Sequence, residues 1–138
     1  MDNPGNIIQE PALKYNYISP EEYLEQEMAA VEKHEYYRGE VFGMSGASRE
    51  HNEIYSNIFT DIGSKLKGKG CKPYGSDFRV HIPKNTLYTY PDIIIICGDP
   101  ELIDEKFGTV TNPSVIFELL SHSTRNYYKG EKFTLYRD

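Results

Sequence analysis

Two apolar runs, each with one carboxylate, constrain the fold of this chain more than any other feature. The first run follows Pro91 and contains four consecutive β-branched residues, Ile93–Ile96. Such a short, unbroken run favours a strand that is buried on both faces of a sheet. Asp92 stands at the start of this run, and Glu118 lies inside the second one, Val115–Leu120. Because an isolated buried charge is costly unless it is neutralised, paired or metal-bound, two such acids on adjacent strands predict a site.

Length and composition describe one globular domain. The chain has 138 residues, of which 38% are hydrophobic and 26% charged, and its formal net charge is −6. This charge argues against avid, non-specific binding to nucleic acid, which depends on neutralising phosphates. The sequence lacks a signal peptide and any apolar run near the roughly 20 residues of a membrane span. Two cysteines, Cys71 and Cys97, form no disulfide framework, so we expect reduced thiols in a cytoplasmic protein without membrane contact.

Periodicity and turn signals predict a mixed α/β chain. Ser19, followed by a proline and two acids, is typical of a helix start. The aromatic or β-branched arms around Arg38-Gly39 favour a hairpin, and apolar residues at helical spacing after Ser48 predict a helix with one buried face. The chain stops at Asp138 within a predicted helix, so either its end is truncated or a partner supplies the last layer, and we expect an unfilled sheet edge beside the Glu118 strand. The expected elements are a flexible N-terminal arm (1–18) and then, within one domain over 19–138, a helix (19–31), a hairpin (34–44), a helix (49–66), a strand (78–82), the two acid-bearing strands (90–97 and 115–120) and a helix (127–137).

The two acids predict a metal site. Carboxylates at the ends of adjacent strands can hold a hard divalent cation such as Mg²⁺, with Mn²⁺ as an alternative. Such an ion polarises a phosphodiester and lowers the pKa of a bound water. A nearby lysine would stabilise the charge of the transition state, and Lys132 is the candidate because it would share a stripe with Leu135 and Tyr136 that points toward the sheet. We therefore expect Asp92 and Glu118 to bind the metal and Lys132 to support the reaction.

Each candidate also has a structural interpretation. Asp92 could cap a turn, Glu118 could form a structural ion pair with Arg79 or another base, and Lys132 could be an ordinary solvated lysine. His51, in the first turns of the second helix, could line the site or pack on the hairpin. These alternatives make different predictions about burial and partners.

Three further groups are weaker candidates. Glu40, in the hairpin, could add to the acidic cluster or could be exposed. Asp77 and Arg79 could form a structural pair near the site. A basic group near the end of the second helix could contact nucleic-acid phosphates, although such groups are more often solvated; it contains Lys65, Lys67, Lys69 and Lys72.

An ordered set of short blocks resembles the Uma-type restriction endonuclease family of bacteria, which belongs to the PD-(D/E)XK nuclease superfamily. The blocks are Lys33-His34-Glu35-Tyr36, Gly39-Glu40-Val41, Gly46-Ala47-Ser48 with His51-Asn52, Ser76-Asp77-Phe78-Arg79-Val80, Tyr90-Pro91-Asp92, Thr111-Asn112-Pro113, Glu118-Leu119-Leu120-Ser121 and Gly130-Glu131-Lys132-Phe133. The resemblance extends from Pro20 to the end of the chain. In the superfamily the lysine usually lies two residues after the second acid, where this chain has Leu120. In this family it lies in the following helix, where Lys132 matches, while His122 and Tyr128 replace a proline and an aspartate that relatives often have.

The resemblance implies a restriction-endonuclease-like fold with a three-layer α/β/α core, a central mixed sheet, and an N-terminal helix and β-hairpin extension. It also implies a homodimer with a Mg²⁺-dependent site. We therefore expect an endonuclease that hydrolyses the phosphodiester bonds of nucleic acid, with DNA as the expected substrate. The departures at Leu120 and Tyr128 and the acidic net charge favour a rival interpretation, a catalytically inactive module of this fold that binds nucleic acid or a protein partner.

Overall fold

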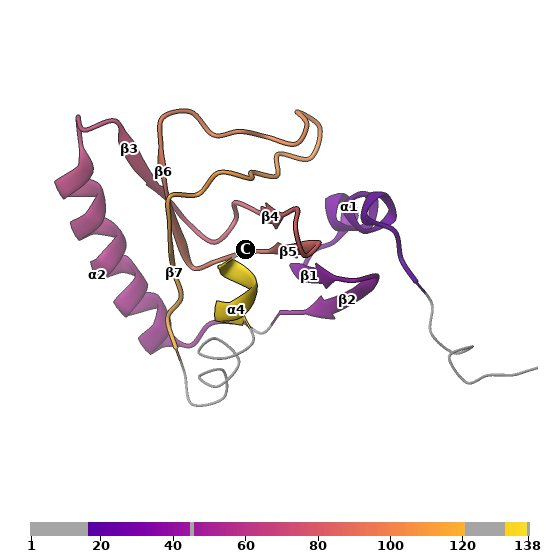
Figure 1. Cartoon of the computed structure of the whole chain (residues 1–138). Helices are drawn as coiled ribbons and strands as arrows, with labels where there is room; N and C mark the ends of the chain where they lie inside the picture. The colour runs from indigo at the N-terminus through magenta and orange to yellow at the C-terminus, as the bar shows by residue number, and fades with distance from the viewer. Residues whose placement is uncertain (1–16, 45, 121–131, 138) are drawn as a thin grey trace, which may run out of the picture.

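Two antiparallel sheets contain the strands of this computed structural model, which describes residues 17–44, 46–120 and 132–137 (Figure 1). The four-stranded sheet has the order β2-β1-β5-β4, and the three-stranded sheet has the order β3-β6-β7. The elements are α1 (Pro20–Ala29), β1 (His34–Tyr37), β2 (Glu40–Gly43), α2 (Arg49–Leu66), β3 (Cys71–Tyr74), β4 (Val80–Ile82), β5 (Leu87–Thr89), β6 (Ile93–Cys97), β7 (Val115–Phe117) and α4 (Phe133–Tyr136). The α/β fold class is confirmed. The expected central mixed sheet is replaced by two sheets whose strand pairs, over the described ranges, are all antiparallel.

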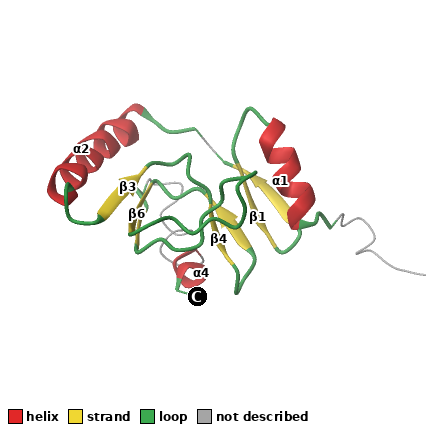
Figure 2. Cartoon of the chain, turned by 90° about the horizontal axis from the view of Figure 1, so that it is seen from above, coloured by secondary structure: helices red, strands yellow, loops and turns green. Residues whose placement is uncertain are grey.

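The helices lie around these sheets in a simple arrangement. Figures 1 and 2 show α1 and α2 at opposite ends of the molecule, with the strands between them. In both views α4 lies between the two sheets, so it can bring its residues to the place where the sheets meet. The predicted arm and the start of the predicted last helix fall largely outside the described residues.

Local signals fix α1 and the hairpin where they were predicted. The Ser19 hydroxyl accepts a hydrogen bond from the Glu22 amide, and the Glu22 carboxylate accepts one from the Ser19 amide, which is a capping box. The β1–β2 hairpin turns at Arg38-Gly39, where both residues have positive φ, as a two-residue hairpin turn of type I′ requires. The helix and the hairpin are confirmed, although α1 ends at Ala29 rather than near Val31.

The apolar run after Pro91 is buried as predicted. β6 is the central strand of its sheet, with β3 on one side and β7 on the other. The side chains of Ile93, Ile94 and Ile96 are therefore almost completely removed from solvent. A second core, under α1, is aromatic: Tyr23 stacks on Tyr36 with 5.1 Å between the ring centroids.

Helix α2 has the predicted bounds, but the face that was predicted to be buried is only partly buried. None of its residues is fully buried: Ile54, at the start of the apolar stripe, is 50% exposed, and the rest of the stripe is half-buried, namely Ile58, Phe59, Ile62 and Leu66. The helix contacts β3, at the end of the three-stranded sheet. Periodicity identifies the apolar face of a helix, but the amount of burial depends on the tertiary contacts that this face makes, which periodicity does not give.

Cys71 and Cys97 form a disulfide, so the expectation of reduced thiols is wrong. The two residues face each other in register on β3 and β6, with their Cα atoms 3.9 Å apart. Strand β3 is short, contains Pro73 and has no apolar run, so sequence patterns did not predict it or the pairing that brings the cysteines together. Over the described ranges, no helix is both long enough and apolar enough to cross a membrane.

The predicted unfilled edge is present in the described part of the sheet. β7 is the last strand of the order β3-β6-β7, so its strand neighbour is β6 alone. A pocket of about 420 Å³ lies beside this edge and is lined by residues of β4, β7 and α4.

Candidate active site

The pairing of β6 with β7 places the two predicted acids beside each other. Ile93 is opposite Phe117 in the register, so Asp92 and Glu118 each stand one residue beyond the same end of the pair. The Asp92 amide donates to Glu118 Oε1 at 3.2 Å, and the Leu119 amide donates to Asp92 Oδ2 at 2.7 Å. Both carboxylates are mostly buried, with side-chain exposures of 16% and 10%. The predicted convergence of two acids on adjacent strands is therefore present.

Lys132 is fully buried and points toward these acids. Its Nζ lies 2.6 Å from Glu35 Oε2 and 3.2 Å from Glu118 Oε2. The residue immediately precedes α4, which lies between the two sheets, so its side chain can reach acids from both (Figure 1). The interpretation of Lys132 as a solvated lysine is wrong, because its exposed fraction is 0%.

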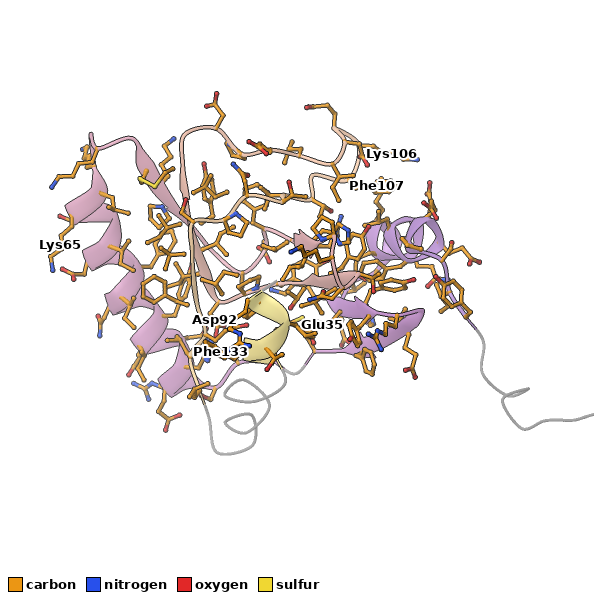
Figure 3. All side chains as sticks on the ribbon, viewed as in Figure 1. Glu35, Lys65, Asp92, Lys106, Phe107 and Phe133 are labelled. Atoms are coloured by element: carbon orange, nitrogen blue, oxygen red, sulfur yellow. A yellow bond between two sulfur atoms is a disulfide. The ribbon has the colours of Figure 1, made fainter. Side chains whose placement is uncertain are left out.

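Glu35 is a site residue that sequence reasoning missed. It lies in β1, and besides Lys132 it accepts a hydrogen bond from the Thr89 hydroxyl of β5. Figure 3 shows Glu35 and Asp92 on either side of α4. Glu35 was quoted only as part of a family block, because β1 looked like an outer hairpin arm and the neighbouring β5 was not predicted. The one sequence signal that could have identified Glu35 is a charged residue between two ring-bearing neighbours, His34 and Tyr36, in a predicted strand.

His51 lines the site, as one of its two interpretations predicted. Its Nε2 lies 3.0 Å from Asp92 Oδ1, and 23% of its side chain is exposed. The N-terminus of α2 fixes this position, because the Ser48 hydroxyl accepts a hydrogen bond from the His51 amide at 3.1 Å. α2 therefore delivers an imidazole from outside the sheets to the acid that precedes β6.

Tyr136 contacts the Glu118 oxygen that does not face the Asp92 amide. Its hydroxyl donates to Glu118 Oε2 at 2.5 Å, and the ring lies 5.6 Å from Lys132 Nζ. Burial raises the pKa of the Glu118 carboxyl, and the nearby Lys132 ammonium acts in the opposite direction. Burial likewise raises the pKa of the Tyr136 hydroxyl, which therefore stays protonated and remains a donor.

The raised pKa of Glu118 predicts a pH dependence of stability. The folded protein binds this proton more tightly than the unfolded chain, whose glutamate has a pKa of 4.5. The resulting stabilisation is fully present below that value and is lost as the pH rises through the raised pKa. We expect urea unfolding at a series of pH values to show this fall, and Glu118→Gln to flatten it. Glu25→Gln, at an exposed carboxylate paired with Lys106, is the matched control; equal slopes in all three proteins would contradict the prediction.

The two structural ion pairs proposed for Arg79 are absent. The buried Arg79 guanidinium donates to the Tyr90 hydroxyl, the Thr109 hydroxyl and the Phe107 carbonyl. Arg79 is therefore not the partner of Glu118 or of Asp77, and the ion pair of Glu118 is with another base, Lys132. Asp77 instead lies 3.2 Å from Lys33 Nζ and is almost fully exposed.

The remaining candidates lie away from the acids. Glu40 is exposed in β2, and none of the contacts found over the described ranges joins it to the site. Lys65 is paired with Asp61 near the end of α2, and Lys67, Lys69 and Lys72 are exposed just beyond it. With a rise of about 1.5 Å per residue, Lys65 lies roughly 20 Å from His51 along the helix axis. Figure 3 shows Lys65 and Asp92 well separated, so phosphate binding by this lysine group stays a prediction.

The two carboxylates are better suited to an ion that keeps several water ligands than to an ion that is bound by protein side chains alone. Among the side chains that the structure describes, no group of three or more His, Cys, Asp and Glu is placed to hold an ion. Mg²⁺, however, keeps several waters and usually takes one or two carboxylates. Asp92 and Glu118 are the two carboxylates that could do this, because the hydrogen bond from the Asp92 amide to Glu118 Oε1 holds the two residues beside each other. The donor set therefore fits Mg²⁺.

Known proteins resemble this chain in sequence and in fold. The profile of a family described as "Uma2: Putative restriction endonuclease" matches residues 20–138. Two uncharacterized proteins of Synechocystis sp., slr1290 and sll1609, are each 35% identical to it; the alignments cover 94% and 87% of this chain and 67% and 68% of the relatives. The crystal structure of a putative nuclease belonging to DUF820 from Anabaena variabilis superposes with a TM-score of 0.60 at 19% identity, over 82% of this chain and 66% of that one. The chain thus spans about two thirds of each of these proteins, and the structural likeness supports a restriction-endonuclease-like fold.

Proposed function

The chain belongs to the Uma2 family of putative restriction endonucleases, and we propose that it is a metal-dependent endonuclease that hydrolyses phosphodiester bonds in DNA. The observation that carries this proposal is the position of Lys132. A fully buried ammonium lies between Glu35 and Glu118, and Glu118 is hydrogen-bonded to the neighbouring Asp92. Buried charges of both signs at one point, where two sheets and a helix meet, are more typical of a reaction site than of a core.

Asp92 and Glu118 are the residues that would hold the cation, which we expect to be Mg²⁺. When bound, the ion would polarise the phosphodiester and make a coordinated water more acidic. The protein keeps both carboxylates in place with fixed donors: the Leu119 amide for Asp92 and the Tyr136 hydroxyl for Glu118. Because these donors are already oriented, little reorganisation is needed when substrate binds.

Lys132 would stabilise the negative charge that develops on the phosphoryl oxygens. Its Nζ lies beside Glu118, so a phosphate that approaches the acids also approaches the ammonium. Glu35, itself hydrogen-bonded to Thr89, fixes the direction of the lysine side chain. In a site shielded from water this attraction is stronger than at the surface.

Cleavage of closed circular DNA tests the proposal. We expect the purified chain to convert supercoiled plasmid into nicked and linear forms in the presence of Mg²⁺ or Mn²⁺, and to stop when a chelator is added. A circular substrate has no ends, so this result would identify an endonuclease. No cleavage above that of an identically purified Asp92→Asn preparation would contradict the proposal.

The inactive-module interpretation is supported by the net charge of −6 and by the two acids that already neutralise Lys132. Calorimetry with Mg²⁺ separates the two functions. Metal binding that is lost in Glu118→Ala supports the nuclease, and complete absence of binding supports the inactive module. A homodimer is a further part of the proposal, and light scattering on the purified chain checks it. The cytoplasmic location was expected from reduced thiols, and the Cys71–Cys97 disulfide removes that argument.

A further inference from the structure

We propose that the pocket beside the β7 edge binds one nucleobase of the substrate, next to the phosphate that is cleaved, and that the chain consequently prefers single-stranded to duplex DNA. This inference rests on the proposed function, because the phosphate of the same nucleotide lies at the paired acids. It deepens that function by naming the form of DNA that is bound and the residues that select it.

The pocket adjoins the acids and the buried lysine. Tyr136 lines the pocket, and its hydroxyl donates to Glu118 Oε2 at 2.5 Å. Phe133 also lines it and directly follows Lys132 in the chain. Ile116, on β7, lines it two residues before Glu118. Because a single sugar joins the base and the phosphate of a nucleotide, a phosphate at the acids has its base within reach of the pocket.

The charge of the lining suits a polyanion. Among the described residues that line the pocket there is no acid, although the chain contains 21 acidic residues. Arg137 is the lining residue with a permanent positive charge, and its guanidinium lies 5.7 Å from the centre of the Phe133 ring. An arginine beside an aromatic ring provides a charge for phosphate and a face on which a base can stack. This part of the surface therefore favours DNA despite the net charge of −6.

The walls of the pocket suit the flat faces of a base. Phe133, Pro83 and Val115 line it with exposed side chains, and the Phe133 ring is 54% exposed. The volume of about 420 Å³ falls in the roughly 300–1,000 Å³ range of small-molecule sites, so a base and its sugar fit. Every base has a π face, so stacking of this kind accepts all four bases.

His81 supplies a hydrogen-bond acceptor to the pocket that it lines. Its Nδ1 lies 2.9 Å from the Leu87 carbonyl oxygen, so we assign the hydrogen to Nδ1. Burial lowers the pKa of the imidazole, which favours the neutral ring and leaves Nε2 as an acceptor. Over the described ranges Nε2 has no hydrogen-bond partner. The amino groups of adenine, guanine and cytosine are donors of the kind that this nitrogen accepts.

A base can enter the pocket only when it is outside the double helix. In duplex DNA each base is paired and stacked, and removing it from the helix has a free-energy cost. Single-stranded DNA avoids most of this cost. The preference for single strands follows from the pocket and not from the acids.

Fluorescence anisotropy with short labelled oligonucleotides tests the pocket independently of cleavage. The probes, in Ca²⁺, are a single strand, its duplex, and a fully abasic strand that keeps the phosphates. We expect the intact single strand to bind about tenfold more tightly than either of the others, a usual effect of stacking one base on an aromatic side chain.

Two variants change the pocket in opposite ways. Phe133→Ala removes a wall, and Val115→Trp fills the space; each should reduce the difference between intact and abasic strands to less than about twofold. Phe42→Ala is the matched control, because Phe42 is an exposed phenylalanine of the β1–β2 hairpin, and it should keep the difference. Circular dichroism checks that all three variants are folded.

Photo-cross-linking with DNA that contains 5-iodouracil locates the bound base. We expect mass spectrometry to find the cross-link at Phe133 or Tyr136. Cross-links confined to rings outside the pocket, such as Tyr55 and Phe59 of α2, would overturn the inference. Equal affinity of the wild type for intact and abasic strands would also overturn it, and plasmid cleavage decides the proposed function separately. A chain that neither binds DNA nor cleaves plasmid would overturn both.

Discussion

Lys132→Met is expected to lower the rate of DNA cleavage by about 10²–10³-fold, the usual effect of removing one group that stabilises transition-state charge. Methionine keeps the length of the side chain but removes the ammonium that lies beside Glu35 and Glu118. The two acids would then remain buried without their shared cation. Plasmid cleavage under single-turnover conditions measures the effect.

The same substitution should also destabilise the fold. Removing one partner from a buried charge pair typically costs about 3–5 kcal/mol, because the remaining charge is left uncompensated. Urea unfolding measures this cost. Lys65→Met is the matched control, since Lys65 is an exposed lysine paired with Asp61 on α2, and it should change stability by less than about 1 kcal/mol.

A double variant separates catalysis from folding. Glu35→Gln removes one of the two acids that Lys132 neutralises, so Lys132→Met with Glu35→Gln should regain part of the lost stability. It should not regain cleavage, because the ammonium is still absent. If the double variant cleaved DNA at the wild-type rate, Lys132 would have a structural role only.

Asp92→Asn is expected to remove metal binding and to lower the rate of cleavage by at least about 100-fold. The reason is that a bound ion contributes several kcal/mol of transition-state stabilisation, which would be lost with it. Asparagine preserves the shape of the side chain and an acceptor for the Leu119 amide. The fold should therefore survive, and the lost charge should account for the effect. Calorimetry with Mg²⁺ and the plasmid assay measure the two parts.

Asp77→Asn is the control for this substitution. Asp77 carries the same charge but is almost fully exposed and pairs with Lys33. Its variant should bind metal and cleave DNA as the wild type does. An Asp92→Asn protein that retained wild-type cleavage would show that the paired strand ends are not the catalytic centre.

The elements that sequence patterns predicted have strong local causes. The capping box at Ser19 and the Arg38-Gly39 turn are decided by neighbouring residues, and both are present. The isoleucine run of β6 could be identified because a buried central strand has few polar positions. The strand with Glu118 was predicted over 115–120, whereas β7 ends at Phe117, so Glu118 stands just beyond the strand rather than inside it. The sequence nevertheless predicted that Asp92 and Glu118 would lie on neighbouring strands.

What sequence patterns missed depends on contacts between distant segments. Glu35 is part of the site because β5 pairs with β1 and because Lys132 reaches across from α4. The Cys71–Cys97 bond depends on the pairing of β3 with β6. These long-range pairings follow from how the whole fold closes, and a local pattern contains little information about them.

A crystal of the chain soaked in Mn²⁺ tests the central claim most directly. Anomalous scattering locates manganese independently of any assumption about activity. We expect one strong peak between the carboxylates of Asp92 and Glu118, with Lys132 still buried beside Glu118. A saturated crystal with no peak within bonding distance of Asp92 would contradict the assignment of this site as a metal-dependent nuclease centre.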